Sequence, residues 1–206
     1  DTVDLNGGQP GIGELDPFAI YSTLDLFRYS SASLLLGADV LDGAYGGTSY
    51  KTPVLDRMAR QGMRFDHAYS NPVCTPSRVK IMTGLSNVRN YASFSILKKT
   101  ERTIGHMMQD AGYRTAIAGK WQLYGAEHYP DFIRAKGALP HPMGFERHCL
   151  WQVDKSGSRF WAPQITIDGA LQTFGDDVYG PDIYSEFLLD RMEEYRDEPF
   201  FLYYPM

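Results

Sequence analysis

Runs of apolar residues alternate along the chain with segments that carry a helical pattern. Residues 33–39 form a continuous apolar stretch that ends in an aspartate, which is typical of a strand buried on both faces. Residues 113–118 and 200–204 are predicted strands that follow a glycine and a proline, respectively, and residues 63–69 alternate well enough to form another. These four segments supply the predicted sheet.

The predicted helices have recognisable starts and stops. The segment 52–62 begins with Thr52 as N-cap and Pro53 at the first helical position, and it ends at a glycine. Residues 103–111 are also followed by a glycine, and residues 181–196 carry apolar side chains at helical spacing. Strands that alternate with helices predict an α/β layer fold with a mainly parallel sheet.

Chemistry in such a fold is expected at the carboxyl ends of the strands. Asp39, the loop that carries Cys74, and Lys120 each follow a predicted strand. Because ligands of parallel sheets bind beyond these strand ends, we expect the three residues to converge in space.

Composition narrows the classes of function. The 206 residues are 43% hydrophobic and 22% charged, which is enough for one sizeable core. A net charge of -5 without a basic cluster argues against a nucleic-acid partner, and no stretch approaches the roughly 18 apolar residues of a membrane span. Cys74 and Cys149 form neither a disulfide framework nor a zinc motif. The first residues show no signal peptide, which is either absent or removed.

The segment 71–84 reads as a loop with two prolines that runs into a short helix, predicted to start near Pro76. Cys74 stands at the mouth of this helix and Arg78 one turn later, so the helix dipole and the guanidinium both favour a thiolate nucleophile. The alternative is a small buried cysteine. The pattern Cys-x-Pro-Ser-Arg, followed by Thr-Gly, resembles the maturation signature of type I sulfatases, with Met82 where the family usually has leucine.

Further segments are similar to sulfatase sequences and follow in the family's order. They are residues 52–65, 87–91, 111–121, 149–152 and 198–203. Several matching patterns in the right order do not plausibly arise by chance. The resemblance implies an alkaline-phosphatase-like three-layer sandwich with a mainly parallel central sheet. It makes residues 32–206 the N-terminal part of a sulfatase catalytic domain and leaves residues 1–31 as an unassigned, loop-rich segment.

The resemblance implies roles for four residues. Cys74 would be oxidised by a separate formylglycine-generating enzyme to formylglycine, whose hydrate attacks the sulfur of a sulfate ester. Arg78 would stabilise the ionised nucleophile, and Lys120 would neutralise the sulfate unless it is only a solvated turn residue. Gln122 stands where most of the family has a catalytic histidine, and it either binds sulfate weakly or simply packs.

The family also implies a divalent cation, usually calcium, beside residue 74. Asp39 matches the first of the consecutive aspartates of the family, but Val40 stands at the second. Asp42 could replace that carboxylate only in a rebuilt loop. We therefore expect a metal site of Asp39, Asp42 and Cys74 whose affinity is weakened by the lost ligand.

The predicted activity is hydrolysis of a sulfate ester of a small molecule or carbohydrate, in the periplasm or outside the cell by family analogy. Alternatives are a phosphonate or phosphodiester hydrolase of the same superfamily, and a catalytically silent sulfate- or glycan-binding remnant. Val40 removes a carboxylate and the chain stops at Met206, before further ligands of the family, so an impaired enzyme is expected. The last strand, 200–204, is then expected to form an uncovered sheet edge.

Overall fold

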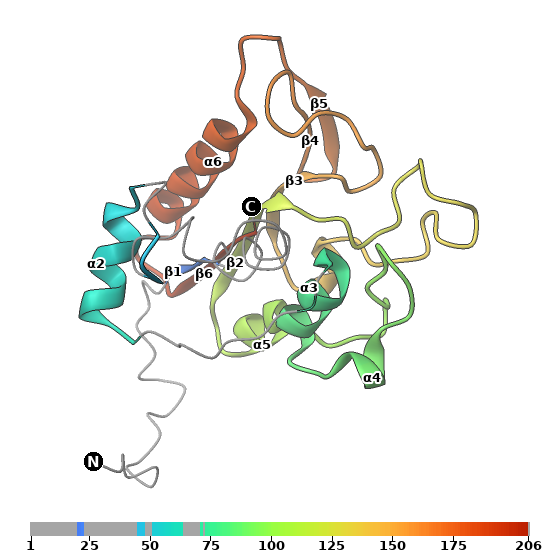
Figure 1. Cartoon of the computed structure of the whole chain (residues 1–206), viewed down its shortest axis with the longest axis horizontal. Helices are drawn as coiled ribbons and strands as arrows, with labels where there is room; N and C mark the ends of the chain where they lie inside the picture. The colour runs from blue at the N-terminus through green and yellow to red at the C-terminus, as the bar shows by residue number, and fades with distance from the viewer. Residues whose placement is uncertain (1–19, 23–44, 48–50, 64–70, 72, 206) are drawn as a thin grey trace, which may run out of the picture.

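The computed structural model of the chain describes residues 20–22, 45–47, 51–63, 71 and 73–205 (Figure 1). The strand predicted over residues 33–39, with Asp39 and Asp42, lies outside the described residues, and so do residues 64–69 of the strand predicted over 63–69. Within the part of the chain that is described, no helix has the length and apolar character needed to cross a membrane.

Six strands of the described chain form one sheet. They are β1 (Ile20–Ser22), β2 (Arg114–Lys120), β3 (Arg147–Trp151), β4 (Gln164–Ile167), β5 (Ala170–Thr173) and β6 (Phe200–Tyr204). Their order across the sheet is β1-β6-β2-β3-β4-β5. The first four pair in parallel, whereas β4 pairs antiparallel with both β3 and β5. The sheet is therefore mainly parallel with an antiparallel hairpin at one edge.

The helices occupy the segments between strands. They are α2 (Pro53–Gln61), α3 (Cys74–Thr83), α4 (Asn87–Asn90), α5 (Ile104–Asp110) and α6 (Gly180–Glu194), with a 3₁₀ helix, η4 (His141–Met143). The helices predicted over 52–62, 103–111 and 181–196 are confirmed as α2, α5 and α6. The strands predicted over 113–118 and 200–204 are confirmed as β2 and β6.

Successive residues of β2 face two different cores. Ala116 and Ala118 belong to the same hydrophobic cluster as Leu188 of α6, whereas Ile117 between them belongs to the cluster that contains Val79 of α3. Figure 1 shows α6 on one side of the sheet and α3 and α5 on the other. This arrangement confirms the predicted three-layer α/β sandwich, because each face of a strand buried in this way needs its own cover.

β6 is an interior strand of the sheet. It pairs with β2 on one side and with β1 on the other, in the register Ile20↔Leu202. The expectation of an uncovered edge at residues 200–204 was therefore wrong. The neighbouring strand comes from residues 20–22, where the sequence carries too short a pattern to predict one.

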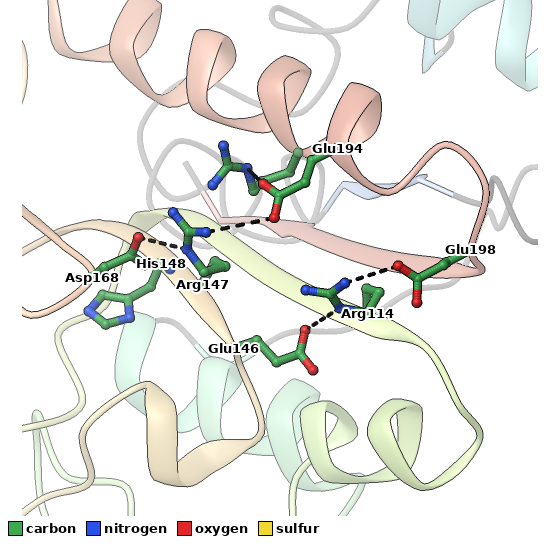
Figure 2. A network of polar contacts seen from close by, with 8 residues as sticks. Arg114, Glu146, Arg147, His148, Asp168, Glu194 and Glu198 are labelled. Carbon is green, nitrogen blue, oxygen red and sulfur yellow. Dashed lines mark hydrogen bonds and ion pairs between the residues drawn. The ribbon is translucent and has the colours of Figure 1, made fainter.

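Ion pairs tie together the amino ends of β2 and β3 (Figure 2). Arg114, at the start of β2, lies 2.8 Å from Glu146 and 3.0 Å from Glu198. Arg147, at the start of β3, lies 2.7 Å from Asp168. Because these groups are partly exposed, each pair contributes only about 0–1 kcal/mol. The pairs lie at the opposite end of β2 from Lys120, which is the last residue of that strand.

Candidate active site

Helix α3 presents Cys74 at its first position. The helix begins at Cys74 rather than near Pro76 as predicted, and Pro76 fits within the first turn because N–H groups there have no partner inside the helix. Gly84 ends the helix with φ 67°. Cys74 is half-buried at the positive end of the helix.

The carboxyl end of β2 brings Lys120 close to Cys74. The place where these two residues meet Arg78 and Gln122 is here called the corner. The Lys120 N–H donates to the carbonyl of Pro205 at 2.7 Å. Gly119, with φ 113°, runs so close to this carbonyl that a Cβ atom would lie 2.2 Å from the Pro205 oxygen. Only glycine permits this backbone approach. The glycine before the lysine therefore fixes where β2 ends and where Lys120 begins.

The two residues after Lys120 continue the pairing with the last residue of β3 and the residue after it. Trp121 N–H donates to Trp151 O at 2.9 Å, and Gln122 N–H donates to Gln152 O at 3.0 Å. The Trp121 side chain is fully buried, and its Nε1 donates to Ala138 O at 2.9 Å. Gln122 has φ 47°, a left-handed conformation uncommon for a residue other than glycine. The paired backbone holds Gln122 in this conformation and places its side chain at the corner.

The Gln122 side chain connects the two elements of the site. The Cys74 thiol donates to Gln122 Oε1 at 3.1 Å, and Gln122 Nε2 donates to Tyr129 Oη at 3.0 Å. Ser95 links the two elements again behind this contact. Its N–H donates to Thr75 Oγ1 at 3.0 Å, and its hydroxyl donates to Gln122 O at 3.4 Å. The position of residue 74 relative to Gln122 is thus set by two independent connections.

Two cationic side chains surround this pair. Arg78 is fully buried, and its Nη2 donates to the Lys120 carbonyl oxygen. The Lys120 ammonium lies beside the Cys74 side chain, with Nζ 5.8 Å from the centre of the Trp151 ring. Burial lowers the pKa of Lys120, the Cys74 thiolate raises it, and the charges of Arg78 and Arg159 lower it. The corner concentrates positive charge, as a site for an anion requires.

The structure therefore brings together four of the six candidate residues: Cys74, Arg78, Lys120 and Gln122. Asp39 and Asp42 lie outside the described residues. Among the residues that are described, no three His, Cys, Asp or Glu side chains are grouped to hold a metal ion.

Cys149 differs from Cys74 in its burial and in its place in the fold. It is fully buried in β3, and both cysteines are free of disulfides, as the sequence predicted. Desolvation raises the pKa of the Cys149 thiol to about 12. Cys149 is therefore an inert core residue, because the thiolate is the reactive form.

A hollow of about 710 Å³ lies apart from this corner. His141, His148 and Asp168 are among its lining residues, and none of Cys74, Arg78, Lys120 and Gln122 lines it. Volume alone does not identify the site, because the charge and the nucleophile lie elsewhere.

Several residues around the corner carry no signal that sequence reasoning can use. Ser95, Tyr129 and Arg159 stand in segments without periodicity or a matching pattern. Trp151 does fall within the segment 149–152 that resembles sulfatases, but nothing there indicates that its ring would lie near Lys120. These contacts come from tertiary structure alone.

Most of this chain is similar in sequence to known proteins. The sulfatase family profile matches residues 24–206. An N-acetylglucosamine-6-O-sulfatase from Bacteroides thetaiotaomicron is 28% identical over 164 residues, which is 78% of this chain and 26% of the relative. An arylsulfatase from Hemicentrotus pulcherrimus is 30% identical over 192 residues, which is 78% of this chain and 33% of the relative. The chain thus spans about a third or less of the length of these two relatives.

Solved structures agree with the fold. A protein in complex with its substrate D-glucosamine-2-N,6-O-disulfate superposes with a TM-score of 0.64 at 27% identity, over 80% of this chain and 31% of that one. A sulfatase from a Pseudoalteromonas species superposes with a TM-score of 0.60 at 22% identity, over 79% of this chain and 40% of that one. The fold is the alkaline-phosphatase-like α/β sandwich. With a family profile that matches nearly its whole length, the chain belongs to the sulfatase family.

Proposed function

We propose that the protein hydrolyses a sulfate ester with residue 74, oxidised to formylglycine, as the nucleophile. The observation that carries this proposal is the meeting of Cys74 with Lys120 and Gln122 at one corner, beside the buried charge of Arg78. A sulfate ester is an anion whose sulfur is shielded by negative oxygens. Its hydrolysis therefore needs a strong nucleophile held among fixed positive charges.

The chemistry follows from a hydrated aldehyde at residue 74. One hydroxyl attacks sulfur, the bond from sulfur to the ester oxygen breaks, and the alcohol leaves after taking up a proton. The second hydroxyl then loses its proton as the carbonyl re-forms, and the bond from carbon to the sulfate oxygen breaks. Sulfate leaves, and water restores the hydrate. The reaction needs no redox step after maturation, because a separate formylglycine-generating enzyme has already oxidised Cys74.

Each residue of the corner has a distinct role in this proposal. Lys120, beside residue 74, pairs with the sulfate oxygens. Arg78 is too deeply buried to follow a substrate, so it acts as a fixed charge that favours the ionised nucleophile. Gln122 accepts a hydrogen bond from residue 74 and so orients it. An amide has no titrating proton, so Gln122 does not replace the proton transfer that a histidine could perform.

The proposal includes a divalent cation, calcium or a similar ion. Asp39, Asp42 and residue 74 would hold it. When bound, such an ion lowers the pKa of a coordinated hydroxyl and balances the charge of the sulfate. Val40 removes one carboxylate that the family usually supplies, so we expect weaker binding than in a site with consecutive aspartates.

The substrate class that fits best is a sulfated carbohydrate, acted on in the periplasm or outside the cell. Two similar proteins support the carbohydrate. One is named an N-acetylglucosamine-6-O-sulfatase, and the other was solved with a sulfated glucosamine as its substrate. A phosphonate or phosphodiester hydrolase is the alternative enzyme, and a silent binding protein is the alternative from another class.

The test is a comparison of matched substrates. The protein is produced together with a formylglycine-generating enzyme and assayed with calcium on an aryl sulfate and on the phosphonate of the same aryl alcohol. We expect turnover of the sulfate, its loss in Cys74→Ala, and its loss on chelation of calcium. Faster turnover of the phosphonate would favour the alternative enzyme. Binding of sulfated sugar without turnover of either ester would favour the silent protein.

A further inference from the structure

Arg159 and Lys120 share one aromatic ring at the rim of the corner. The Arg159 Cζ lies 5.4 Å from the centre of the Trp151 ring, and the Lys120 Nζ lies 5.8 Å from the same centre. The Arg159 charge lowers the pKa of both Lys120 and Arg78, which is the effect of a third cation close to two others. Arg159 therefore belongs to the electrostatic surroundings of residue 74.

Like charges placed together need a compensating anion, and within the described residues Arg159 has no protein partner that supplies one. In the described part of the chain, no carboxylate forms an ion pair with Arg159, and no hydrogen bond engages its guanidinium. Six other arginines do have such partners: Arg102, Arg114, Arg134, Arg147, Arg191 and Arg196. None of the Arg159 nitrogens is buried without a partner, so each of them reaches solvent. A guanidinium in this state is ready for an external anion.

The guanidinium of Arg159 is held in place even though its nitrogens are exposed. Its Cζ lies 4.4 Å from the centre of the Phe160 ring in addition to its contact with Trp151. The backbone is fixed as well, because Gly180 N–H donates to Phe160 O at 2.6 Å. A Cβ atom on Gly180 would lie 2.1 Å from the Arg159 carbonyl oxygen, so only glycine allows this contact. Little conformational entropy is then lost when Arg159 binds a ligand.

An aromatic cluster adjoins Arg159 through Phe160. The Trp161 and Tyr179 rings lie 4.9 Å apart, and Tyr179 stacks with Phe160 at 6.3 Å. Trp161 is 59% exposed and Phe160 is 45% exposed. Exposed aromatic side chains grouped in this way mark a surface for contact with a ligand. Their flat faces suit the apolar C–H face of a sugar ring.

We infer that Arg159 binds a second anionic group, on the alcohol part of the sulfate ester, so that the preferred substrates are carbohydrate sulfates with two negative charges. The first anion is the sulfate beside residue 74 and Lys120. The second is a further sulfate or a carboxylate, and Trp161 contacts the ring that carries it. This inference rests on the proposed function, since it concerns the same site.

The expected contribution of Arg159 to the preference for a disulfated ligand is moderate, because Arg159 is only half-buried. A hydrogen-bonded contact between a charged donor and a charged acceptor gives a preference of about tenfold. Arg159 also adds to the general positive potential, so its loss weakens the binding of every anion, and more so the binding of the ligand with the higher charge. The comparison therefore includes Arg159→Lys, which keeps the charge but loses the planar guanidinium, so that a direct contact is distinguished from the general effect.

The test uses the Cys74→Ser protein, which needs no maturation, and titration calorimetry with two probes. The first probe is glucosamine 6-sulfate, and the second is a glucosamine disulfate, tested both as the 2-N,6-O-disulfate and as the 3,6-O-disulfate. We expect the protein with Arg159 to bind one of the disulfates about tenfold more tightly than it binds the monosulfate. Arg159→Gln should bring the ratio close to one, Arg159→Lys should restore part of it, and Arg196→Gln, an exposed arginine elsewhere, should leave it unchanged.

Three outcomes would overturn the inference. A preference for the disulfate that survives in Arg159→Gln would place the second anion elsewhere. Equal affinity for mono- and disulfated probes in the unaltered protein would show that no second anion is bound. Failure of every sulfated probe to bind would instead contradict the proposed function and remove the inference with it. Thermal unfolding of Arg159→Gln and Arg159→Lys checks that both variants are folded.

Discussion

Cys74 Sγ lies 3.1 Å from Gln122 Oε1, although 48 residues separate the two in the chain. Cys74 begins a helix, and Gln122 follows the end of a central strand. Gln122 Oε1 accepts from the thiol, and it would accept equally from a hydroxyl at residue 74. The contact therefore gives Gln122 a role in positioning the nucleophile, whichever chemical form residue 74 has.

The role of Gln122 can be separated from simple packing. We expect Gln122→Ala to lower kcat/KM by about 100-fold, which is the cost typical of losing one polar contact in an active site. Gln122→Glu should cost more, because it places a carboxylate next to the bound sulfate. Steady-state kinetics on an aryl sulfate measures both variants. An alanine variant within twofold of the parent would show that Gln122 only packs.

Maturation of Cys74 should precede folding. The residues that follow it in the maturation signature, Thr75 to Val79, are buried, and Arg78 is fully inaccessible. A modifying enzyme cannot read side chains that are enclosed in a folded core. We expect the enzyme to convert Cys74 readily in an unfolded chain or a synthetic peptide spanning 71–84, and poorly in the folded protein. Mass spectrometry of residue 74 after equal incubation compares the two, and equal conversion would contradict the expectation.

Much of the site could be predicted from short-range signals. The start of α2 at Pro53, the glycine that ends α3, and the lysine after Gly119 each follow from local backbone rules. Cys74 and Arg78 are one helical turn apart, so their proximity needs only the helix. The meeting of Cys74 with Gln122 is different, because it depends on how α3 packs on the sheet. The strand-end rule predicted that the Cys74 loop and Lys120 converge, but it could not predict the contact of residue 74 with Gln122.

The activity should fall in alkaline solution at a pH below the ordinary pKa of lysine, because Lys120 loses its proton there. Burial lowers its pKa, and so do the charges of Arg78 and Arg159. Because only the ammonium pairs with sulfate, kcat/KM should fall as the pH rises through this lowered pKa. Lys120→Arg keeps its charge in alkaline solution, so its profile should lose that limb while its maximum falls. A pH–rate profile that is unchanged in Lys120→Arg would remove Lys120 from the proposed role.

The lowered pKa of Lys120 makes stability rise with pH, whereas it makes activity fall. The folded state releases the proton of Lys120 more readily than the unfolded state does. The free energy of unfolding therefore gains a contribution that grows with pH between the lowered pKa and the ordinary value of about 10.4. Lys120→Met should be at least as stable as the parent at neutral pH, although its activity falls by about 100- to 1,000-fold. Denaturant unfolding measures this, and a large loss of stability would show that Lys120 serves the fold.

Gly119 should be a structural requirement of the site. A Cβ atom there would meet the Pro205 oxygen at 2.2 Å, and φ is 113°. Gly119→Ala should cost about 3 kcal/mol or more in the free energy of unfolding, from the clash and the strained backbone together. Gly112→Ala is the matched control, because φ is 85° and no atom lies within 4 Å. We expect the control to cost about 1 kcal/mol, and equal costs would contradict the argument from close approach.

The errors of prediction share a physical cause. Residues 200–204 carry a clear strand pattern, but whether a strand lies inside a sheet or at its edge depends on partners far away in the chain. β1 has three residues, too few for any periodicity to show. β3, β4 and β5 were also not predicted, and Ala170–Thr173 of β5 is exposed along its length and carries no alternation of buried positions. Arg159 carries no local signal at all, since its importance comes from Trp151 and Lys120.

The central claim is that formylglycine at residue 74 performs the hydrolysis. The most direct measurement is the rate of sulfate release, plotted against the fraction of residue 74 that mass spectrometry finds as aldehyde, over preparations made with different amounts of the formylglycine-generating enzyme. The account predicts a straight line through the origin at saturating calcium. Release of sulfate by protein whose residue 74 is entirely cysteine, or a rate that does not change with the converted fraction, would contradict it.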